Sequence, residues 1–251
     1  MVHRILIVTA VAAEADSVSA GLGLGGPELL PLPGGLVLRR HTDTADASVR
    51  ADVLVGGVGP AAVAASTGTA LAYAALTGPD SAGYELVVSA GIAGGFQPLA
   101  PLGSVVVSTT VVAADLGAET PDGYLTVEEL GFGRSAHPVP EALTGRIAAA
   151  LAAGGRPHAV APVLTVSTVT GTARRAAELA DRHPGAAAEA MEGFGVAEAA
   201  AAYGVPVVEI RAVSNAVGPR DRGAWRIGEA LDALRHTFAL LSPTVLVEPS
   251  P

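Results

Sequence analysis

Two short strings in the C-terminal half of the chain carry side chains suited to binding a sugar and a base. The first is Met191-Glu192-Gly193, and the second is Arg211-Ala212-Val213-Ser214-Asn215. The carboxylate of Glu192 can accept hydrogen bonds from two neighbouring sugar hydroxyls, and the amide of Asn215 offers both a donor and an acceptor to the polar edge of a purine. Because each residue lies at the end of an apolar segment, we expect both in one pocket.

Glu14 is a third candidate, far from the other two in sequence. It follows the apolar run 5–9 and begins an Ala-rich stretch, so we expect it near the carboxyl end of the first strand. There its carboxylate can act as a base toward water. The simpler interpretation is a surface partner of a helix dipole. Asn215 has a simpler interpretation too, as a residue that ends a strand in a turn.

Two glycine-rich strings follow apolar runs. Gly57-Val58-Gly59-Pro60-Ala61-Ala62 fits the dinucleotide-binding pattern G-x-G-x-x-A. However, Pro60 lacks one of the needed N–H groups, and the expected acidic residue is missing. The string therefore predicts a tight turn with proline at the first helical position. The string 89–96 predicts a turn of small residues, either against a ligand or simply crowded.

The elements that must position these residues are short runs rich in Val, Ile and Leu, alternating with Ala-rich stretches. The runs predict strands at 5–9, 36–40, 53–56, 85–89, 104–112, 162–168 and 207–213. The Ala-rich stretches predict helices at 12–20, 60–76, 141–153, 173–182, 196–203 and 224–241. This alternation predicts an α/β fold, with three α/β/α layers in a single domain and a mixed central sheet covered on both faces.

Active sites in such sheets gather at the carboxyl ends of the strands. The predicted ends, and hence the predicted pocket, are at Thr9-Ala10, Gly57-Val58-Gly59, Ala90-Gly91, Thr168-Val169 and Ser214-Asn215. The segments 21–35 and 113–134 are expected to be loops. The domain is expected to span residues 1–241. Residues 242–251, with three prolines, are expected to form a loosely attached tail.

Composition argues against several classes of protein. The net charge is -9, and no cluster of Lys or Arg could neutralise a run of phosphates, which excludes nucleic acid as a partner. The first apolar run is too short to cross a membrane. The chain has no Cys, which fits a reducing cytoplasm, and its six His residues lack metal-ligand spacing. We therefore expect no metal and no cofactor.

These residues together resemble the purine nucleoside phosphorylase and nucleosidase superfamily over nearly the whole chain. The Met-Glu string followed by the Arg-Ala-x-Ser-Asn string carries most of this resemblance. Within this superfamily the chain resembles methylthioadenosine/S-adenosylhomocysteine nucleosidase and, more strongly, futalosine hydrolase. Residues 218–222 with 225–227 are similar to the futalosine hydrolase branch. The resemblance implies a nucleoside phosphorylase-like hydrolase fold, a purine nucleoside as small-molecule partner, a cytoplasmic location and a homodimer.

The resemblance also implies roles for individual residues. Glu14 matches the carboxylate that activates the attacking water, Glu192 the one that holds the ribose hydroxyls, and Asn215 the residue that recognises the base. The other matching positions are Met191 against the sugar, Ala93 and Gly94 near the nucleophile and base, and Thr168 and Val169 at the purine.

Two departures from the family pattern narrow the expected activity. Phosphorylases hold phosphate with an Arg after the first strand and a Ser or Thr in the glycine turn, whereas this chain has no Arg in 10–14 and carries Ile92 in the turn. Hydrolysis is therefore favoured. Asn215 stands where adenine-specific relatives carry Asp, which favours a 6-oxopurine, although one amide can also pair with adenine.

The resemblance thus implies a nucleosidase that releases hypoxanthine from futalosine in menaquinone biosynthesis. Arg220, Arg222 and Trp225 are expected around the carboxylate-bearing end of the substrate, or else form a solvated charged turn. One alternative is hydrolysis of methylthioadenosine, S-adenosylhomocysteine or aminofutalosine. Another is a catalytically silent nucleoside-binding protein.

Overall fold

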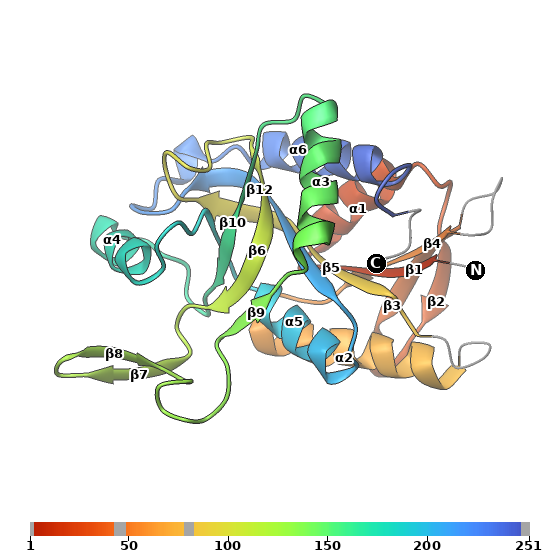
Figure 1. The fold of residues 1–251 in the computed structure, drawn as a ribbon. Helices are drawn as coiled ribbons and strands as arrows, with labels where there is room; N and C mark the ends of the chain where they lie inside the picture. Colours follow the sequence, from red (N-terminus) through yellow and green to blue (C-terminus); the bar gives the residue numbers. More distant parts are fainter. Residues whose placement is uncertain (1–2, 43–48, 78–82, 247–251) are drawn as a thin grey trace.

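A computed structural model describes residues 3–42, 49–77 and 83–246 of the chain. Its centre is a ten-stranded mixed sheet with helices on both faces (Figure 1). Along the sheet the strands are β11 (Ala188–Ala190), β10 (His158–Thr165), β6 (Val105–Ala113), β12 (Val207–Ala216), β5 (Leu86–Gly95), β1 (His3–Thr9), β4 (Val49–Val55), β3 (Val37–Thr42) and β2 (Glu28–Pro31). A tenth strand, β9 (Ala136–Pro138), pairs with β6.

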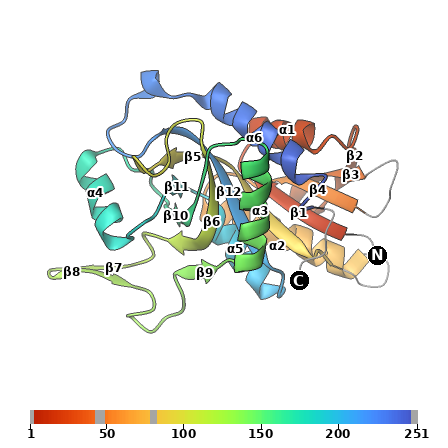
Figure 2. The same cartoon turned by 45° about the horizontal axis from the view of Figure 1, so that its top comes forward.

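The middle of the sheet is parallel, since β4, β1, β5 and β12 run in the same direction. Beyond them, β6 runs antiparallel to β12 and parallel to β10. The short strand β11 pairs with β10 and also, in the antiparallel sense, with the end of β5. The strands β5, β12, β6, β10 and β11 therefore close into a ring at one side of the sheet (Figure 2).

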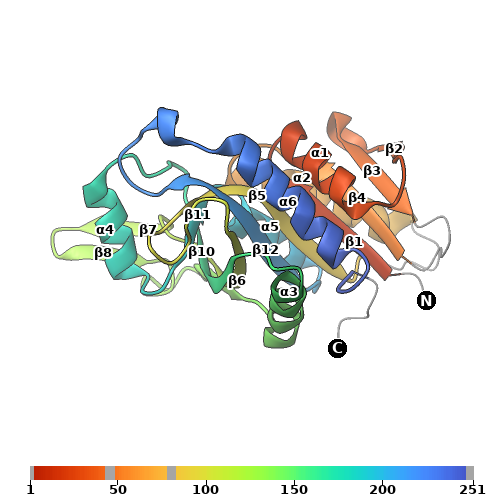
Figure 3. The same cartoon turned by 90° about the horizontal axis from the view of Figure 1, so that it is seen from above.

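Two pairs of helices cover the sheet. On one face α1 (Ala12–Leu22) packs against α6 (Ile227–Leu241), and on the other α2 (Pro60–Thr77) packs against α5 (Gly193–Ala202), as Figure 3 shows. Two further helices, α3 (Glu141–Ala153) and α4 (Ala173–Arg182), follow β9 and β10. The main core consists largely of Ala, Val, Leu and Ile, which suit buried helices and strands. The predicted fold class is confirmed.

Several short elements lie where the sequence predicted loops. The strand β2 falls inside 21–35, and the hairpin of β7 (Gly117–Thr120) and β8 (Gly123–Thr126) falls inside 113–134. Figure 1 shows this hairpin projecting from the body of the protein. The strands β9 and β11 were not predicted at all. Each of these strands has only three or four residues, too few for a periodic pattern, and forms because a partner strand is adjacent.

The prediction of a turn at 89–96 is wrong, because β5 continues as a strand to Gly95. Its small residues extend the strand since β12 pairs along one edge and β11 along the other. Gly91 shows why small residues are needed there. A Cβ at Gly91 would lie 2.5 Å from Oε1 of Glu14 and 2.6 Å from Nη1 of Arg211. The absence of a side chain lets these two groups approach the strand.

Two further boundaries differ from expectation. The strand β10 begins at His158 and ends at Thr165, earlier than predicted, because its first residues pair with the start of β6. The prediction of a loose tail is wrong for 242–246, since Val245 and Leu246 join the core and the Ser242 hydroxyl donates to the Leu22 carbonyl. Residues 247–251 lie outside the described part, and the domain limits stay a prediction.

No described helix is long and apolar enough to span a bilayer.

Candidate active site

A cavity of about 650 Å³ opens where β1, β5 and β12 end. The sequence-predicted residues among those lining it are Glu14, Ala93, Gly94, Val169, Met191, Glu192, Asn215, Arg220 and Trp225, together with Arg222. Thr168 is exposed and is not in the lining, while its neighbour Thr170 is. The cavity thus brings together residues from distant parts of the chain, as expected from strand ends that share one edge.

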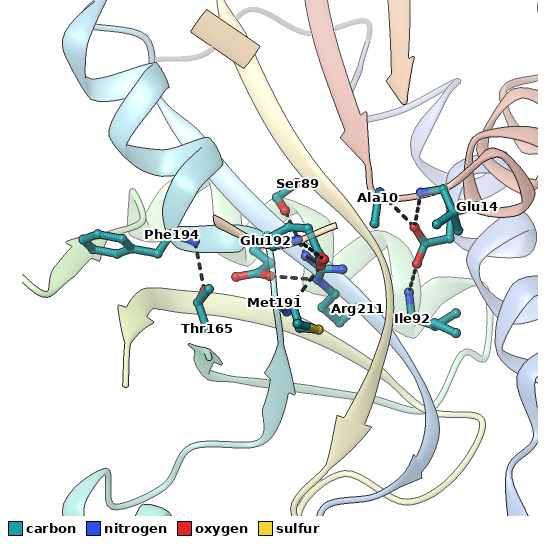
Figure 4. Close-up of polar contacts among 12 residues, drawn as sticks. Ala10, Glu14, Ser89, Ile92, Thr165, Met191, Glu192, Phe194 and Arg211 are labelled. Atoms are coloured by element: carbon teal, nitrogen blue, oxygen red, sulfur yellow. Dashed lines mark hydrogen bonds and ion pairs between the residues drawn. The ribbon is translucent and has the colours of Figure 1, made fainter. Parts of the chain in front are cut away.

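Glu14 is held at this edge by backbone N–H groups from two segments. The strand β1 ends at Thr9 and α1 begins at Ala12, so Glu14 lies in the first helical turn. Its Oε2 accepts from the N–H groups of Ala10 at 2.9 Å and Val11 at 3.2 Å, and its Oε1 accepts from the N–H of Ile92 at 2.9 Å (Figure 4). The buried carboxylate therefore has a fixed orientation beside the cavity.

Arg211 lies beneath the cavity, directly beside Gly91 in the pairing of β12 with β5. Its side chain is only 1% exposed. Nε donates to Oε1 of Glu209 at 2.8 Å, and Nη2 lies 3.2 Å from both the Ser89 hydroxyl and Oε2 of Glu192 (Figure 4). Nη1 has no hydrogen-bond partner in the described structure and points toward the side of Gly91 where Glu14 lies.

The charges around Arg211 are strongly coupled. Burial, the largest influence, lowers the pKa of Arg211, but the carboxylates of Glu209, Glu192 and Glu14 together outweigh burial and raise that pKa above its ordinary value. Burial raises the pKa of Glu209, and the adjacent guanidinium opposes this rise. A buried cation is costly unless it is paired. The charged state of Arg211 therefore depends on these three carboxylates.

Glu192 lies between β11 and α5 and is the N-cap residue of α5. Its Oε1 accepts from the N–H of Gly59 at 3.2 Å, and its Oε2 accepts from the N–H of Met191 at 3.3 Å. The start of α5 is also fixed by the Thr165 hydroxyl, which accepts from the N–H of Phe194. These contacts place a buried carboxylate at the cavity, with lone pairs left to accept hydrogen bonds from a ligand.

The amide of Asn215 is oriented by its neighbours. Oδ1 accepts from the Ser214 hydroxyl at 2.8 Å, and Nδ2 donates to the Ala216 carbonyl at 3.0 Å. The reversed amide would place two oxygens against each other, so these contacts select one orientation. One N–H and one lone pair remain for a ligand. Gly94 lies against this amide, since a Cβ there would be 3.2 Å from Nδ2.

A rim segment, residues 217–226, borders the cavity after β12. It carries two exposed arginines whose guanidinium groups lie over the indole of Trp225, at 5.2 Å for Arg220 and 5.6 Å for Arg222. The segment is attached at both ends, because the N–H of Val217 donates to Gly95 and the N–H of Arg226 donates to Ser214. It therefore presents two cations and an aromatic ring at the entrance of the cavity.

Sequence reasoning missed several contributors to the cavity. The backbone N–H groups that hold Glu14 cannot be recognised from the sequence, because every residue except proline has one. Thr170 and Glu189 line the cavity too. Glu189 was not predicted as a site residue, because β11 is too short to reveal which way its side chains point. The glycine string at 57–62 leads into α2, which begins at Pro60 as predicted. The N–H of Gly59 donates a hydrogen bond to Glu192, so this string holds a side chain of the protein.

The described residues contain no group of three or more His, Asp or Glu side chains that could hold a metal ion. The polar groups that meet in the cavity include three held carboxylates, one oriented amide and the arginines of the rim segment. Such a set can activate water, hold vicinal hydroxyls and bind the edge of a base.

The family is shown by comparison with known proteins. The model described as the phosphorylase superfamily matches residues 4–244. The chain therefore belongs to the phosphorylase superfamily.

Within the superfamily, the chain groups with the futalosine hydrolases. It is 56% identical to futalosine hydrolase of Streptomyces coelicolor, with 96% of each chain covered. It is 46% identical to futalosine hydrolase of Acidothermus cellulolyticus, covering 94% of this chain and 89% of the relative. The resemblance inferred from the sequence is confirmed.

Solved structures share the fold at low identity. A 5'-methylthioadenosine/S-adenosylhomocysteine nucleosidase from Helicobacter pylori superposes with a TM-score of 0.77 at 19% identity, with 97% of each chain covered. Futalosine hydrolase from Helicobacter pylori strain 26695 superposes with a TM-score of 0.76 at 18% identity, with 95% of each chain covered. Both confirm the architecture.

Replacing Arg211 with Met should destabilise the protein by about 3–5 kcal/mol, because Glu209 and Glu192 would be left as buried charges without their cation. Urea unfolding followed by circular dichroism measures the change. Arg222→Met, which alters an exposed arginine in the same way, should change the free energy of unfolding by less than about 0.5 kcal/mol. Equal stability of the two variants would contradict the role assigned to Arg211.

Proposed function

We propose that this chain hydrolyses the N-glycosidic bond of futalosine, releasing hypoxanthine and leaving dehypoxanthinyl futalosine. The identity of 56% to one futalosine hydrolase and of 46% to another, over nearly the full chain, supports this substrate. The enzyme is an N-glycosyl hydrolase that acts on a purine nucleoside, and the absence of a metal or cofactor stays a prediction from the sequence. Its location in the cytoplasm and its assembly as a homodimer stay predictions from the sequence.

The observation that most directly supports hydrolysis over phosphorolysis is the position of the Glu14 carboxylate. The N–H groups of Ala10, Val11 and Ile92 converge at the cavity, as in a backbone anion site. In this chain an internal carboxylate fills them. A phosphate nucleophile would lose these donors and meet a like charge, whereas a neutral water can donate a hydrogen bond to the same carboxylate. The site therefore favours water over phosphate.

Breaking the glycosidic bond builds positive charge on the sugar and negative charge on the departing purine. In the proposed mechanism, Glu14 orients the water at the anomeric carbon and accepts its proton. Glu192 accepts hydrogen bonds from the ribose hydroxyls, with Met191 against the sugar, and so fixes the reacting carbon relative to the water. Negative charge at Glu14 and Glu192 also stabilises the oxocarbenium-like sugar.

The base is assigned to the part of the cavity at Asn215. The free N–H of its oriented amide can donate to N7 or O6 of a 6-oxopurine, which stabilises charge on the departing base. Ala93 and Gly94 form the adjoining wall, and Val169 borders the base from the segment after β10. Because an amide cannot supply a full proton, the leaving purine must be stabilised by hydrogen bonding alone at this residue.

The carboxylate-bearing end of futalosine is assigned to the rim segment. Arg220 and Arg222 offer donors that recognise carboxylates, and Trp225 offers an aromatic face to the benzoate ring. Both arginines and the indole border the cavity, which supports this placement. This end of the substrate also distinguishes futalosine from inosine, which carries the same base but no benzoate group.

The proposed function is tested by incubating the protein with futalosine, aminofutalosine, methylthioadenosine and inosine, with and without phosphate, and resolving the free bases. We expect hypoxanthine from futalosine at a rate independent of phosphate, because Glu14 occupies the anion site. A requirement for phosphate would contradict hydrolysis. Failure to cleave futalosine, or faster release of adenine from methylthioadenosine, would contradict the substrate.

Asn215→Asp should shift the preference toward 6-aminopurines, because a carboxylate removes the N–H donor to O6 and N7 and introduces an acceptor for the exocyclic amine. The ratio of kcat/KM for futalosine to that for aminofutalosine should fall by about tenfold or more. Asn215→Ser removes the donor amide without adding a charge and serves as the control for loss of contact. An unchanged ratio in the Asp variant would show that Asn215 does not select the base.

A further inference from the structure

A short loop, residues 167–171, forms part of the cavity between β10 and α4. Val169 and Thr170 line the cavity, and Thr172 follows as the N-cap of α4. The loop makes little regular structure of its own, so its shape depends on the groups that bond to its backbone. Two carboxylates supply such bonds, one at the start of the loop and one at its middle.

Asp115 holds the start of the loop, since its Oδ2 accepts from the N–H of Ser167 at 2.7 Å. Glu189 holds the middle. Its Oε1 accepts from the N–H of Thr170 at 2.8 Å, and its Oε2 accepts from the Thr170 hydroxyl at 2.5 Å. Asp115 is absent from the cavity lining, whereas Glu189 is part of it. The contact between Glu189 and Thr170 is therefore the one that faces the ligand.

Glu189 lies at the base end of the cavity. In the pairing of β11 with β5 it is directly opposite Gly94, the residue that lies against the Asn215 amide. The loop is also connected to the rim segment, because the N–H of Arg220 donates to the Gly171 carbonyl at 3.3 Å. A displacement of Thr170 would thus reach both the wall of the base pocket and the rim.

Both oxygens of Glu189 contact one residue, Thr170, so the side chain holds the loop rather than a neighbouring strand. It is 6% exposed, and among the described residues it forms no ion pair. Burial raises the pKa of its carboxyl. The two bonds to Thr170 do not need a charge, because a neutral carboxyl can accept from the N–H and donate to the hydroxyl.

We propose that Glu189 is a positioning residue for purine binding: its bidentate contact with Thr170 holds the 167–171 loop, and through Gly171 the rim segment, in the arrangement that receives the base. The inference rests on the proposed function for the identity of the base. An amide has the same shape and can make the same two bonds, so Glu189→Gln preserves the contact. Glu189→Ala removes it.

The chain offers a matched control at Glu128. Its two carboxylate oxygens accept from the N–H and the hydroxyl of Ser135, the same pair of contacts that Glu189 makes with Thr170. Glu128 and Ser135 are absent from the cavity lining. Glu128→Ala therefore removes an equivalent loop contact without touching the base pocket.

The test is calorimetric titration of each variant with hypoxanthine, together with kcat and KM for futalosine. For Glu189→Ala we expect about a tenfold weaker affinity for hypoxanthine and a matching rise in KM, because two hydrogen bonds that order the loop are lost. Glu189→Gln should stay within about threefold of the wild type, as should Glu128→Ala.

Wild-type affinity in Glu189→Ala would overturn the inference, and so would a Glu189→Gln variant as weak as Glu189→Ala, since charge rather than positioning would then matter. If Glu189→Ala does not fold, Thr170→Val decides: it removes the hydroxyl contact alone and should weaken hypoxanthine binding by about threefold, whereas unchanged binding would overturn the inference. If the wild type binds hypoxanthine but leaves futalosine intact, the proposed function fails while the positioning role remains measurable.

Discussion

The buried guanidinium of Arg211 is the interaction on which the catalytic edge depends. It lies on the central strand β12 and meets Glu209 on the same strand, Ser89 on β5 and Glu192 before α5. Glu14 approaches from α1 across Gly91. A single cation, Arg211, thus interacts both with Glu14, the carboxylate assigned to the water, and with Glu192, the carboxylate assigned to the ribose. Because the reaction needs water and anomeric carbon in fixed relation, the rigid strand beneath them is part of the chemistry.

The N–H groups at this edge of the sheet bear on whether water or phosphate is the nucleophile. The first turn of a helix, and a strand that extends past the end of its neighbour as β5 extends past β1, offer unpaired N–H groups, which are natural anion sites. In this protein the N–H groups of Ala10, Val11 and Ile92 are already occupied by Glu14. The occupied site repels an anionic nucleophile and presents an acceptor to water. A phosphorylase would need those donors for phosphate, so the role proposed for Glu14 would account for hydrolysis by a member of the phosphorylase superfamily.

Much of this could be predicted from the sequence, and the rest has physical reasons for being hidden. Long apolar runs such as β1 and β12 indicated the sheet, and Glu14 and Asn215 lie at the ends of those runs. Glu192 was recognised from the Met-Glu string instead, because β11 before it is too short to show a pattern. The extension of β5 through small residues was missed because pairing with two neighbours overrides weak local propensity. The contact of Glu189 with Thr170 was missed because it joins a three-residue strand to a loop, and neither has a periodic pattern.

The proposed hydrolysis depends on Glu14 as the group that activates water, and single-turnover hydrolysis of futalosine by Glu14→Gln tests this role most directly. The amide retains the size of the side chain but cannot take a proton from water. We expect the rate of hypoxanthine release to fall by about 10²–10⁴, while the affinity for hypoxanthine, which is assigned to Asn215 rather than Glu14, stays within about threefold of the wild type. A rate within tenfold of wild type, with affinity preserved, would contradict the account.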